Sequence, residues 1–326
     1  MRIRLSIGPV VALLMAGALC RCAASGAEES LNLLIFGDWG AATYQQKSVA
    51  DAMASYVSRS PAPFAAAFTT GDNFYYTLLG THDPQWKDLF EDLYDARRLP
   101  MPFYAALGNH DYDGANHLVE LAYARQNPAS RWKMPARWYR VDFPAADPTV
   151  TVLVLDSNKP RLSRRQWLDQ LDWMESHLAS PTRAPWIVCV AHHTIYSNGW
   201  HGDNAVLQRD WGELFERYNV PFYLCGHDHN LQHLQVPGLR TSFLVTGAGG
   251  AWRKSMARDD RGPLSRSVHG FVHLEVHPDR AAARFVDTDG QVIHHLERRL
   301  DGTLSVLLTT GTDPVGRQEP GGAQTD

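Results

Sequence analysis

The protein has 326 residues, of which 44% are hydrophobic and 20% are charged, so the chain contains enough apolar material for a large core. This composition excludes a disordered, collagen-like or coiled-coil protein. The 31 basic and 35 acidic residues give a formal net charge of -4, and the overall charge therefore gives no support for a nucleic-acid partner.

The first 27 residues have the pattern of a secretory signal peptide. Arg2 and Arg4 precede an apolar run at residues 7–19, and small residues follow at 23–27. The run is shorter than the roughly 20 residues that a membrane-spanning helix needs. An uncleaved membrane anchor and a buried first strand are the alternative interpretations. We expect cleavage near residue 27, a secreted or periplasmic mature protein, and no membrane association after cleavage.

Two cysteines, Cys189 and Cys225, remain after this cleavage. Both end apolar, strand-like runs, so we expect buried free thiols rather than a disulfide. The apolar core must then hold the fold together.

Short apolar runs alternate with helical patterns from residue 31 to residue 225. This alternation predicts strands that are connected by crossover helices. One helix has a capping-box start, because Gln166 follows Ser163 by three residues. The expected strands are 31–36, 64–68, 103–107, 150–155, 186–191 and 222–225, and the expected helices are 44–58, 84–94, 116–126, 163–178 and 204–218.

The helical period disappears from Leu231 onward, where turns rich in Gly, Pro and Asp separate apolar segments. The tail at 311–326 is Gly-, Pro- and polar-rich, and we expect it to be disordered. With no internal repeat and no linker, the sequence predicts a single domain over 28–310. We expect an α/β fold, a four-layer α-β-β-α sandwich of two mixed sheets packed face to face with flanking helices. The expected antiparallel strands are 242–245, 271–276, 284–287 and 292–300.

Polar motifs directly follow five of the expected strands. Because the carboxyl ends of the strands face one crevice in an open α/β sheet, we expect these five loops to converge there. Each motif alone is more often a turn or a polar loop, but five in this order are a specific signal. The motifs are Gly37-Asp-Trp-Gly40, Gly71-Asp-Asn-Phe-Tyr75, Gly108-Asn-His-Asp111, His192-His193 and Gly226-His-Asp-His229.

The motifs supply the side chains that hard and borderline metal ions prefer. Two carboxylates, one phenol, one amide and three imidazoles are ligands of this kind. Seven groups fit two cations that share one bridging carboxylate, an arrangement that activates water and holds a phosphoryl group. The sequence therefore predicts a dinuclear metal site.

The order of the five motifs resembles the dinuclear metallophosphoesterases and, within them, the purple acid phosphatases of the small mammalian type. The most specific stretch is 223–235, and the resemblance extends from about residue 31 to residue 300. It implies an acid phosphatase that hydrolyses phosphoric monoesters by attack of a metal-bound hydroxide. The implied cofactors are Fe(III) and a second divalent metal, which is iron, zinc or manganese.

Tyr75 is the residue that favours iron. In the wider superfamily the first motif is DxH, but Gly40 stands here two residues after Asp38. The GDxxY spacing supplies Tyr75 instead, and an anionic phenolate favours a trivalent ion. The alternative is that Tyr75 is a buried aromatic residue with a hydrogen-bonded hydroxyl.

The resemblance also implies which residues bind each metal and which face the phosphate. His193 is the alternative to its neighbour His192 as a ligand. His110 and His201 match positions that face the phosphate, and one of them supplies a proton to the leaving group. A solvated loop histidine is the alternative interpretation of His201. The implied ferric site is Asp38, Tyr75, His229 and the bridging Asp72, and the implied divalent site is Asp72, Asn109, His192 and His227.

Two other functions remain open on the sequence. A dinuclear phosphodiesterase or nucleotide hydrolase on the same scaffold would more naturally carry the DxH motif. A secreted protein that binds metal or phosphate without turnover is the other alternative. No motif assigns the physiological substrate or the oligomeric state.

Overall fold

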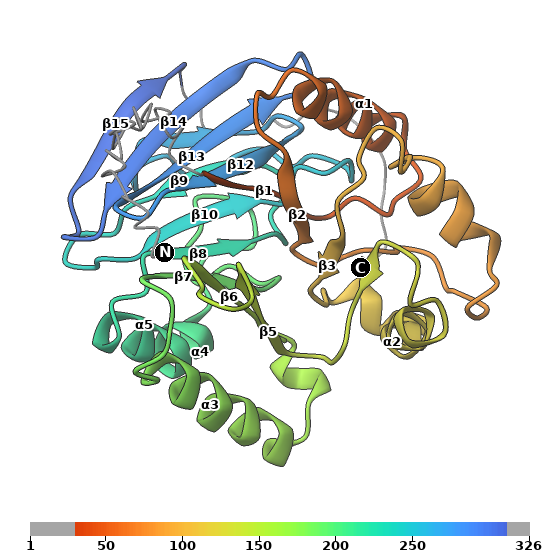
Figure 1. Ribbon diagram of the computed structural model, residues 1–326, viewed down its shortest axis with the longest axis horizontal. Helices are drawn as coiled ribbons and strands as arrows, with labels where there is room; N and C mark the ends of the chain where they lie inside the picture. The colour runs from red at the N-terminus through yellow and green to blue at the C-terminus, as the bar shows by residue number, and fades with distance from the viewer. Residues whose placement is uncertain (1–29, 312–326) are drawn as a thin grey trace, which may run out of the picture.

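The computed structural model describes residues 30–311, so the expected signal peptide and almost all of the expected disordered tail lie outside the described residues. Two mixed β-sheets pack face to face, and helices cover their outer faces (Figure 1). The fold class predicted from the sequence is confirmed. Within residues 30–311, no helix combines the length and the hydropathy that crossing a membrane requires.

The first sheet has eight strands in the order β15-β14-β13-β12-β1-β2-β3-β4. Its first four strands along the chain run parallel, and the strands from β12 onward run antiparallel. The strands are β1 (Leu31–Phe36), β2 (Phe64–Thr69), β3 (Phe103–Ala105), β4 (Trp132–Lys133), β12 (Gly270–Val276), β13 (Arg280–Asp287), β14 (Val292–Arg299) and β15 (Leu304–Thr309).

The second sheet has seven strands in the order β11-β9-β10-β8-β7-β6-β5. The strands β6, β7, β8 and β10 are parallel neighbours, and β5 and β9 pair antiparallel with β6 and β10. The strands are β5 (Tyr139–Phe143), β6 (Val150–Val154), β7 (Trp186–Val190), β8 (Phe222–Cys225), β9 (Leu231–Leu234), β10 (Ser242–Thr246) and β11 (Leu264–Arg266).

The helices form the two outer layers (Figure 1). The first sheet is covered by α1 (Tyr44–Ser58), the π-helical segment η1 (Trp86–Glu91) and α2 (Asn116–Gln126), which follows the 3-10 turn η2 (His110–Ala115). The second sheet is covered by α3 (Arg164–Leu178), which follows the 3-10 turn η3 (Lys159–Arg161), and by α4 (Ala205–Leu207), the π-helical segment η4 (Gln208–Gly212) and α5 (Glu213–Arg217).

Alternating side chains of the strands fill two different cores. In β1, Leu33 and Ile35 face the second sheet, whereas Leu34 and Phe36 face α1 and η1. The period of two residues follows from the pleat of a strand. Because both faces of the sheet are covered, β1 reads in the sequence as a continuous apolar run from Leu33 to Phe36 rather than as an alternating one.

The prediction of a regular helix over 84–94 is wrong in both the length and the type of the helix. The helical segment ends at Glu91, and η1 is a π-helix in which the Asp92 N–H donates to the carbonyl of Lys87. The irregular turn brings Trp86 against Tyr123 of α2, with stacked rings 3.7 Å apart. The expected helix 204–218 is found at 205–217, with the π-helical segment η4 in its middle. Tertiary packing of large aromatic side chains here overrides the regular helical spacing.

Several strands differ from the expectation. β10 pairs parallel with β8, so the chain from Leu231 onward is not purely antiparallel. Five strands were not predicted: β4, β5, β9, β11 and β15. Four of these have five residues or fewer, and β4, β5, β11 and β15 are edge strands, so their local sequence carries little strand signal. Cys189 and Cys225 are buried free thiols, as predicted.

Candidate metal centre

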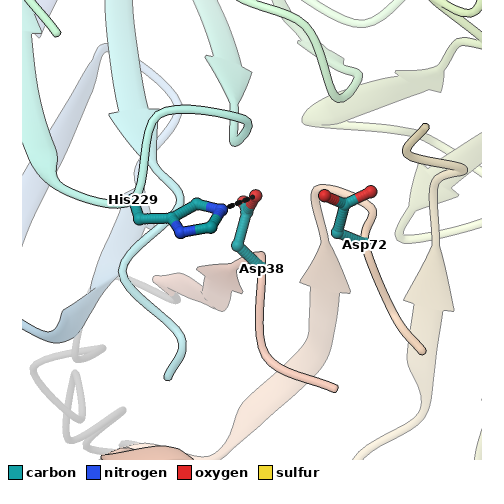
Figure 2. A group of neighbouring side chains, drawn as sticks. All are labelled: Asp38, Asp72 and His229. Atoms are coloured by element: carbon teal, nitrogen blue, oxygen red, sulfur yellow. Dashed lines mark ion pairs between the residues drawn. The ribbon is translucent and has the colours of Figure 1, made fainter. Parts of the chain in front are cut away.

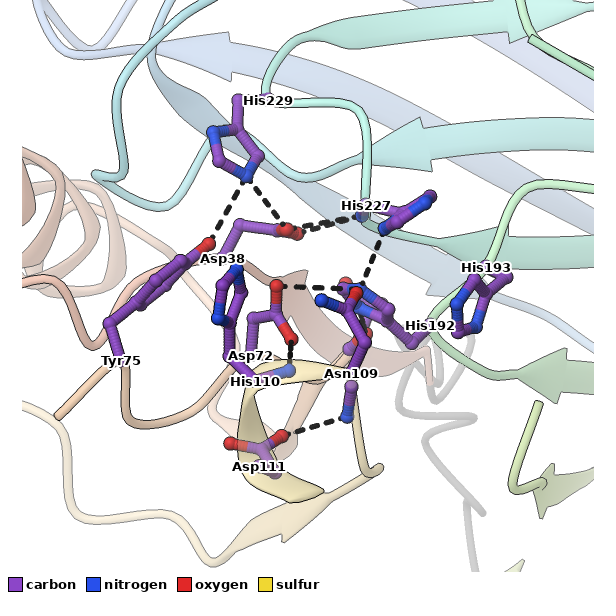
Figure 3. Close-up of polar contacts among 12 residues, drawn as sticks. Asp38, Asp72, Tyr75, Asn109, His110, Asp111, His192, His193, His227 and His229 are labelled. Carbon is purple, nitrogen blue, oxygen red and sulfur yellow. Dashed lines mark hydrogen bonds and ion pairs between the residues drawn. The ribbon is translucent and has the colours of Figure 1, made fainter. Parts of the chain in front are cut away.

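Five loops converge at the carboxyl ends of strands from both sheets. Three of them follow β1, β2 and β3 of the first sheet, and two follow β7 and β8 of the second sheet. The predicted convergence is therefore found, but it takes place between two sheets instead of along the edge of one. Both sheets contribute residues to the cluster, and the packing of the sheets brings the two sets of loops together (Figure 3).

Sharp backbone turns bring the side chains into the space between the sheets. Asp38, Asp72 and His227 have positive φ angles of 57°, 52° and 70°, which non-glycine residues adopt uncommonly and which occur often at functional sites. The backbone at Gly108 lies so close that a Cβ atom there would be 2.1 Å from Asp72 Oδ1. A Cβ atom at Gly226 would be 2.2 Å from Asp38 Oδ2. Only glycine fits at these two positions, because the carboxylates lie directly against the backbone.

One half of the cluster contains Asp38, Tyr75 and His229. His229 Nε2 lies 3.2 Å from Asp38 Oδ1 and 3.1 Å from the Tyr75 hydroxyl. Figure 2 shows Asp38, Asp72 and His229, whose ligand atoms all lie within 4.8 Å of one another. Asp38 and Asp72 are buried. This half has the size of a coordination sphere for one ion.

The other half contains His192, Asn109 and His227. His192 Nε2 lies 3.0 Å from Asn109 Oδ1 and 3.1 Å from His227 Nδ1. The same nitrogen lies 3.4 Å from Asp72 Oδ2. A carboxylate oxygen of Asp72 also lies within 4.8 Å of ligand atoms of Asp38 and His229. Asp72 therefore contacts both halves of the cluster, as a bridging ligand must.

Two backbone carbonyls orient the imidazole rings. His192 Nδ1 donates to the carbonyl of Thr70 at 2.9 Å, and His229 Nδ1 donates to the carbonyl of Trp252 at 2.6 Å. A carbonyl oxygen only accepts, so Nδ1 of each ring carries a proton and Nε2 is directed at the cluster. Sequence reasoning missed Thr70 and Trp252, because a backbone carbonyl leaves no signature in residue type.

The donor set fits bound cations because hydrogen-bond acceptors face one another in it. The lone pair of His192 Nε2 faces the oxygens of Asn109 and Asp72. Two acceptors at about 3 Å repel each other unless a proton or a metal ion lies between them, and the proton of the neutral His192 ring is on Nδ1. Nitrogen and oxygen ligands of these kinds suit iron, zinc and manganese.

The pKa values of Asp38, Asp72, Tyr75 and His192 are shifted toward the neutral forms, whereas at His229 the effect of burial is exceeded by the hydrogen bond to Asp38 and the nearby negative charges together, which raise the pKa. Burial raises the pKa of Asp38, and burial together with the charges of Asp38 and Asp111 raises the pKa of Asp72 well above its usual value. Burial lowers the pKa of His192 well below its usual value. Burial and the Asp72 charge raise the pKa of the Tyr75 hydroxyl, so the phenolate needs a nearby cation to form.

His110 and His201 lie at the mouth of the cluster, each stacked on one of its members. The ring of His201 lies 3.9 Å from the ring of His227, and the ring of His110 lies 4.5 Å from that of Tyr75. Burial lowers the pKa of both histidines. Each is therefore close to the cluster without being among the groups that converge in it.

His193 points away from the converging groups, although it is adjacent to His192. Its Nδ1 lies 2.8 Å from the Ser157 hydroxyl, and burial lowers its pKa to about 4. Figure 3 shows that the ring lies beside His227 and outside the cluster. The structure thus places His192, and not His193, among the candidate ligands.

Two buried acidic residues in the motifs support the loops and were missed by sequence reasoning. Asp111 accepts hydrogen bonds from the backbone N–H groups of Asn73 and Gly108 at 2.8 and 2.7 Å. Asp228 accepts a hydrogen bond from the His201 N–H at 3.0 Å. Both residues stand inside motifs that had been recognised, so their position was a signal that could have been used.

The fold and the cluster together define a metallophosphoesterase. The family model for the calcineurin-like phosphoesterases matches residues 31–231. Among solved structures, the GAP50 anchor of the Plasmodium inner membrane complex has a TM-score of 0.71 and 23% identity, over 87% of this chain and 91% of that chain. The purple acid phosphatase PPD1 from yellow lupin seeds has a TM-score of 0.62 and 18% identity, over 83% of this chain and 54% of that chain. At these identities the likeness shows the fold.

Two relatives with higher identity narrow the class. Tartrate-resistant acid phosphatase type 5 of Mus musculus is 30% identical over 295 residues, which are 80% of this chain and 88% of the relative. Purple acid phosphatase 7 of Arabidopsis thaliana is 30% identical over 288 residues, which are 81% of this chain and 85% of the relative. The chain therefore belongs to the purple acid phosphatases, within the calcineurin-like phosphoesterases. It is an acid phosphatase, a phosphoric monoester hydrolase, and the family predicted from the motifs is confirmed.

Proposed function

We propose that the enzyme hydrolyses phosphoric monoesters with two metal ions, Fe(III) and a divalent ion, which is iron, zinc or manganese. The observation that carries this proposal is the set of opposed acceptor atoms described above, above all the oxygens around His192 Nε2. The ferric site would be Asp38, Tyr75, His229 and Asp72, and the divalent site would be Asp72, Asn109, His192 and His227.

When bound, the metal pair supplies the Lewis acidity that activates water and neutralises charge on the phosphoryl oxygens. The residues of the chain position these groups. Asp72 fixes the separation of the two halves, because its carboxyl group lies 3.4 Å from His192 Nε2 on one side and within 4.8 Å of ligand atoms of Asp38 and His229 on the other. The Thr70 and Trp252 carbonyls keep the imidazole lone pairs directed inward.

His201 and His110 are the proposed proton donor and phosphate contact. An alkoxide leaves slowly without a proton, and an imidazolium that faces the ester oxygen can supply one. His201 stacks on His227 of the divalent half and lines a cavity beside it, so it lies on the side where a leaving group has space. His110 lies on the Tyr75 side and contacts Asp113 through Nδ1 at 3.2 Å. We assign the acid role to His201 and the phosphate contact to His110.

One experiment tests the proposal. The purified protein is analysed for iron, zinc and manganese and assayed on a chromogenic phosphomonoester between pH 4 and pH 9. Two metals per chain and an optimum at acidic pH are expected, because a trivalent ion keeps a bound water deprotonated at lower pH than a divalent ion does. Activity restricted to diesters or nucleotides would favour the alternative hydrolase, and metal or phosphate binding without turnover would favour a binding protein.

The location of the protein belongs to the same proposal. The charged, apolar and small-residue pattern of residues 1–27 supports a cleaved signal peptide and a secreted or periplasmic enzyme with one catalytic domain over 28–310. N-terminal sequencing of the exported protein tests the cleavage point.

A further inference from the structure

A cavity of about 260 Å³ opens beside the divalent half of the cluster. His193, His201 and His227 form one end of it, and residues 202–206 at the start of α4 form the other. None of the described residues that line it is a lysine or an arginine. The cavity therefore begins where the proposed reaction places the leaving group, and its wall has no positively charged side chain to attract a second phosphate.

His193 lines this cavity, and its contact with Ser157 sets the position of its ring proton. The buried hydroxyl oxygen of Ser157 accepts a hydrogen bond from the His193 backbone N–H at 2.9 Å and lies 2.8 Å from His193 Nδ1. In the described part of the chain the Ser157 hydroxyl has no other acceptor, so its proton is directed at Nδ1. Nδ1 is then the acceptor, and the ring proton is on Nε2.

The rest of the cavity wall is polar. Asn204 uses its side-chain oxygen to cap α4, where it accepts from the N–H groups of Val206 and Leu207 at 3.1 Å each. Its amide N–H groups remain as donors. Asp203, which accepts from the Ser197 N–H and pairs with Arg261, supplies further acceptor capacity. A hydroxylated, uncharged group finds both donors and acceptors there.

We propose that the Nε2–H group of His193 donates a hydrogen bond to a hydroxyl oxygen of the leaving group, and that this cavity makes the enzyme selective for phosphoric monoesters of neutral polyhydroxy alcohols, such as hexose or glycerol phosphates. The inference rests on the proposed phosphatase reaction and names its substrate class. An aryl phosphate has no hydroxyl group to accept the bond, so it gains nothing from His193.

The test compares kcat/KM for glucose 6-phosphate and for phenyl phosphate in the metal-loaded enzyme. The His193→Phe variant should lose about tenfold on glucose 6-phosphate, the value of one neutral hydrogen bond, and no more than about threefold on phenyl phosphate. The His193→Gln variant, whose amide carries an N–H at a similar reach, should recover most of the loss. The His177→Phe variant on α3 is the matched control and should change neither value.

Ser157→Ala gives a second test, because it removes the group that sets the tautomer. It should lower kcat/KM for glucose 6-phosphate by a smaller factor than His193→Phe. Nitrogen-15 NMR of the histidine side chains should show His193 protonated at Nε2 in the wild type and a mixture of tautomers in Ser157→Ala.

The outcomes separate this inference from the function on which it depends. An equal loss on both esters in His193→Phe, or a loss of metal, would show that the ring only supports His192 and would overturn the inference. Protonation at Nδ1 in the wild type would overturn it as well. A wild-type enzyme that is loaded with metal and hydrolyses neither ester would instead overturn the proposed phosphatase reaction itself.

Discussion

The hydroxyl group of Tyr75 lies 3.1 Å from Nε2 of His229, although the two residues come from different sheets. Tyr75 follows β2 of the first sheet, and His229 follows β8 of the second. Both atoms also lie near the carboxyl groups of Asp38 and Asp72. The face-to-face packing of the sheets thus assembles the phenol, the imidazole and the carboxylates that the proposed ferric site needs.

This relationship predicts that the purified enzyme is coloured. A phenolate bound to ferric iron gives a ligand-to-metal charge-transfer band in the visible range. The Tyr75→Phe variant should lose that band, which an absorption spectrum of the protein at known iron content measures. A colourless, fully active wild type that contains only zinc or manganese would contradict the ferric assignment, and so would a Tyr75→Phe variant that keeps the band.

Because Asp72 lies between the two halves, its replacement should release more metal than the replacement of a residue that belongs to one half. Asp72→Ala removes the carboxyl group that contacts both halves, so both metals should be lost. Asn109→Ala is the matched variant, and it should lose mainly the divalent ion, because Asn109 contacts only the His192 half. Metal-to-protein ratios after gel filtration measure both, with circular dichroism as the check on folding. Full metal retention in Asp72→Ala would exclude the bridging role.

Replacing His201 and replacing His110 should lower kcat in different ways, depending on the leaving group of the ester. His201→Ala should lower kcat by about 10²- to 10⁴-fold on an alkyl phosphate, the usual contribution of general acid catalysis, and by less on a nitrophenyl phosphate. His110→Ala should lower kcat by a similar factor on both esters, as a phosphate contact does. A His201→Ala variant within about twofold of the wild type on the alkyl ester would return His201 to a solvated loop residue and move the acid role to His110.

The buried His273 in β12 predicts a loss of stability at acidic pH. Burial lowers its pKa to about 3, and its ring is held by Tyr56 and Asn32 at 3.0 and 2.9 Å. Arg284, Glu275 and His295 are the charged or titratable groups that act on it. Below about pH 6.5 the unfolded chain takes up a proton that the folded ring does not, so the free energy of unfolding falls as the pH falls.

This residue alone should lower the free energy of unfolding by about 2 kcal/mol when the pH falls from 7 to 5. Denaturant unfolding at the two pH values measures the difference. The His273→Gln variant should be less stable at pH 7 but should show a smaller decrease on acidification, and the exposed His82→Gln variant serves as the control. An unchanged decrease in His273→Gln would show that other groups account for the acid sensitivity.

The parts of the fold and site that depend on the local order of apolar and polar residues could be predicted from the sequence. The continuous apolar runs of β1 and β7 are typical of strands covered on both faces, and the polar residues that follow them mark the strand ends. The GDxxY spacing with Gly40 in place of a histidine supplied the candidate ferric ligands. Residue type and order were sufficient to name these candidates, because metal-ligand chemistry is a property of the side chain.

The features that depend on contacts between distant segments could be seen only in the folded structure. In the folded protein His192 points into the cluster and His193 points toward Ser157. The carbonyls of Thr70 and Trp252 lie at the Nδ1 atoms of His192 and His229. The fold also contains the short edge strands such as β4 and β11, whose pairing energy comes from partners that the local sequence does not contain. A ring orientation or an edge-strand pairing is fixed by hydrogen bonds and packing across the fold, and these exist only once the two sheets have come together.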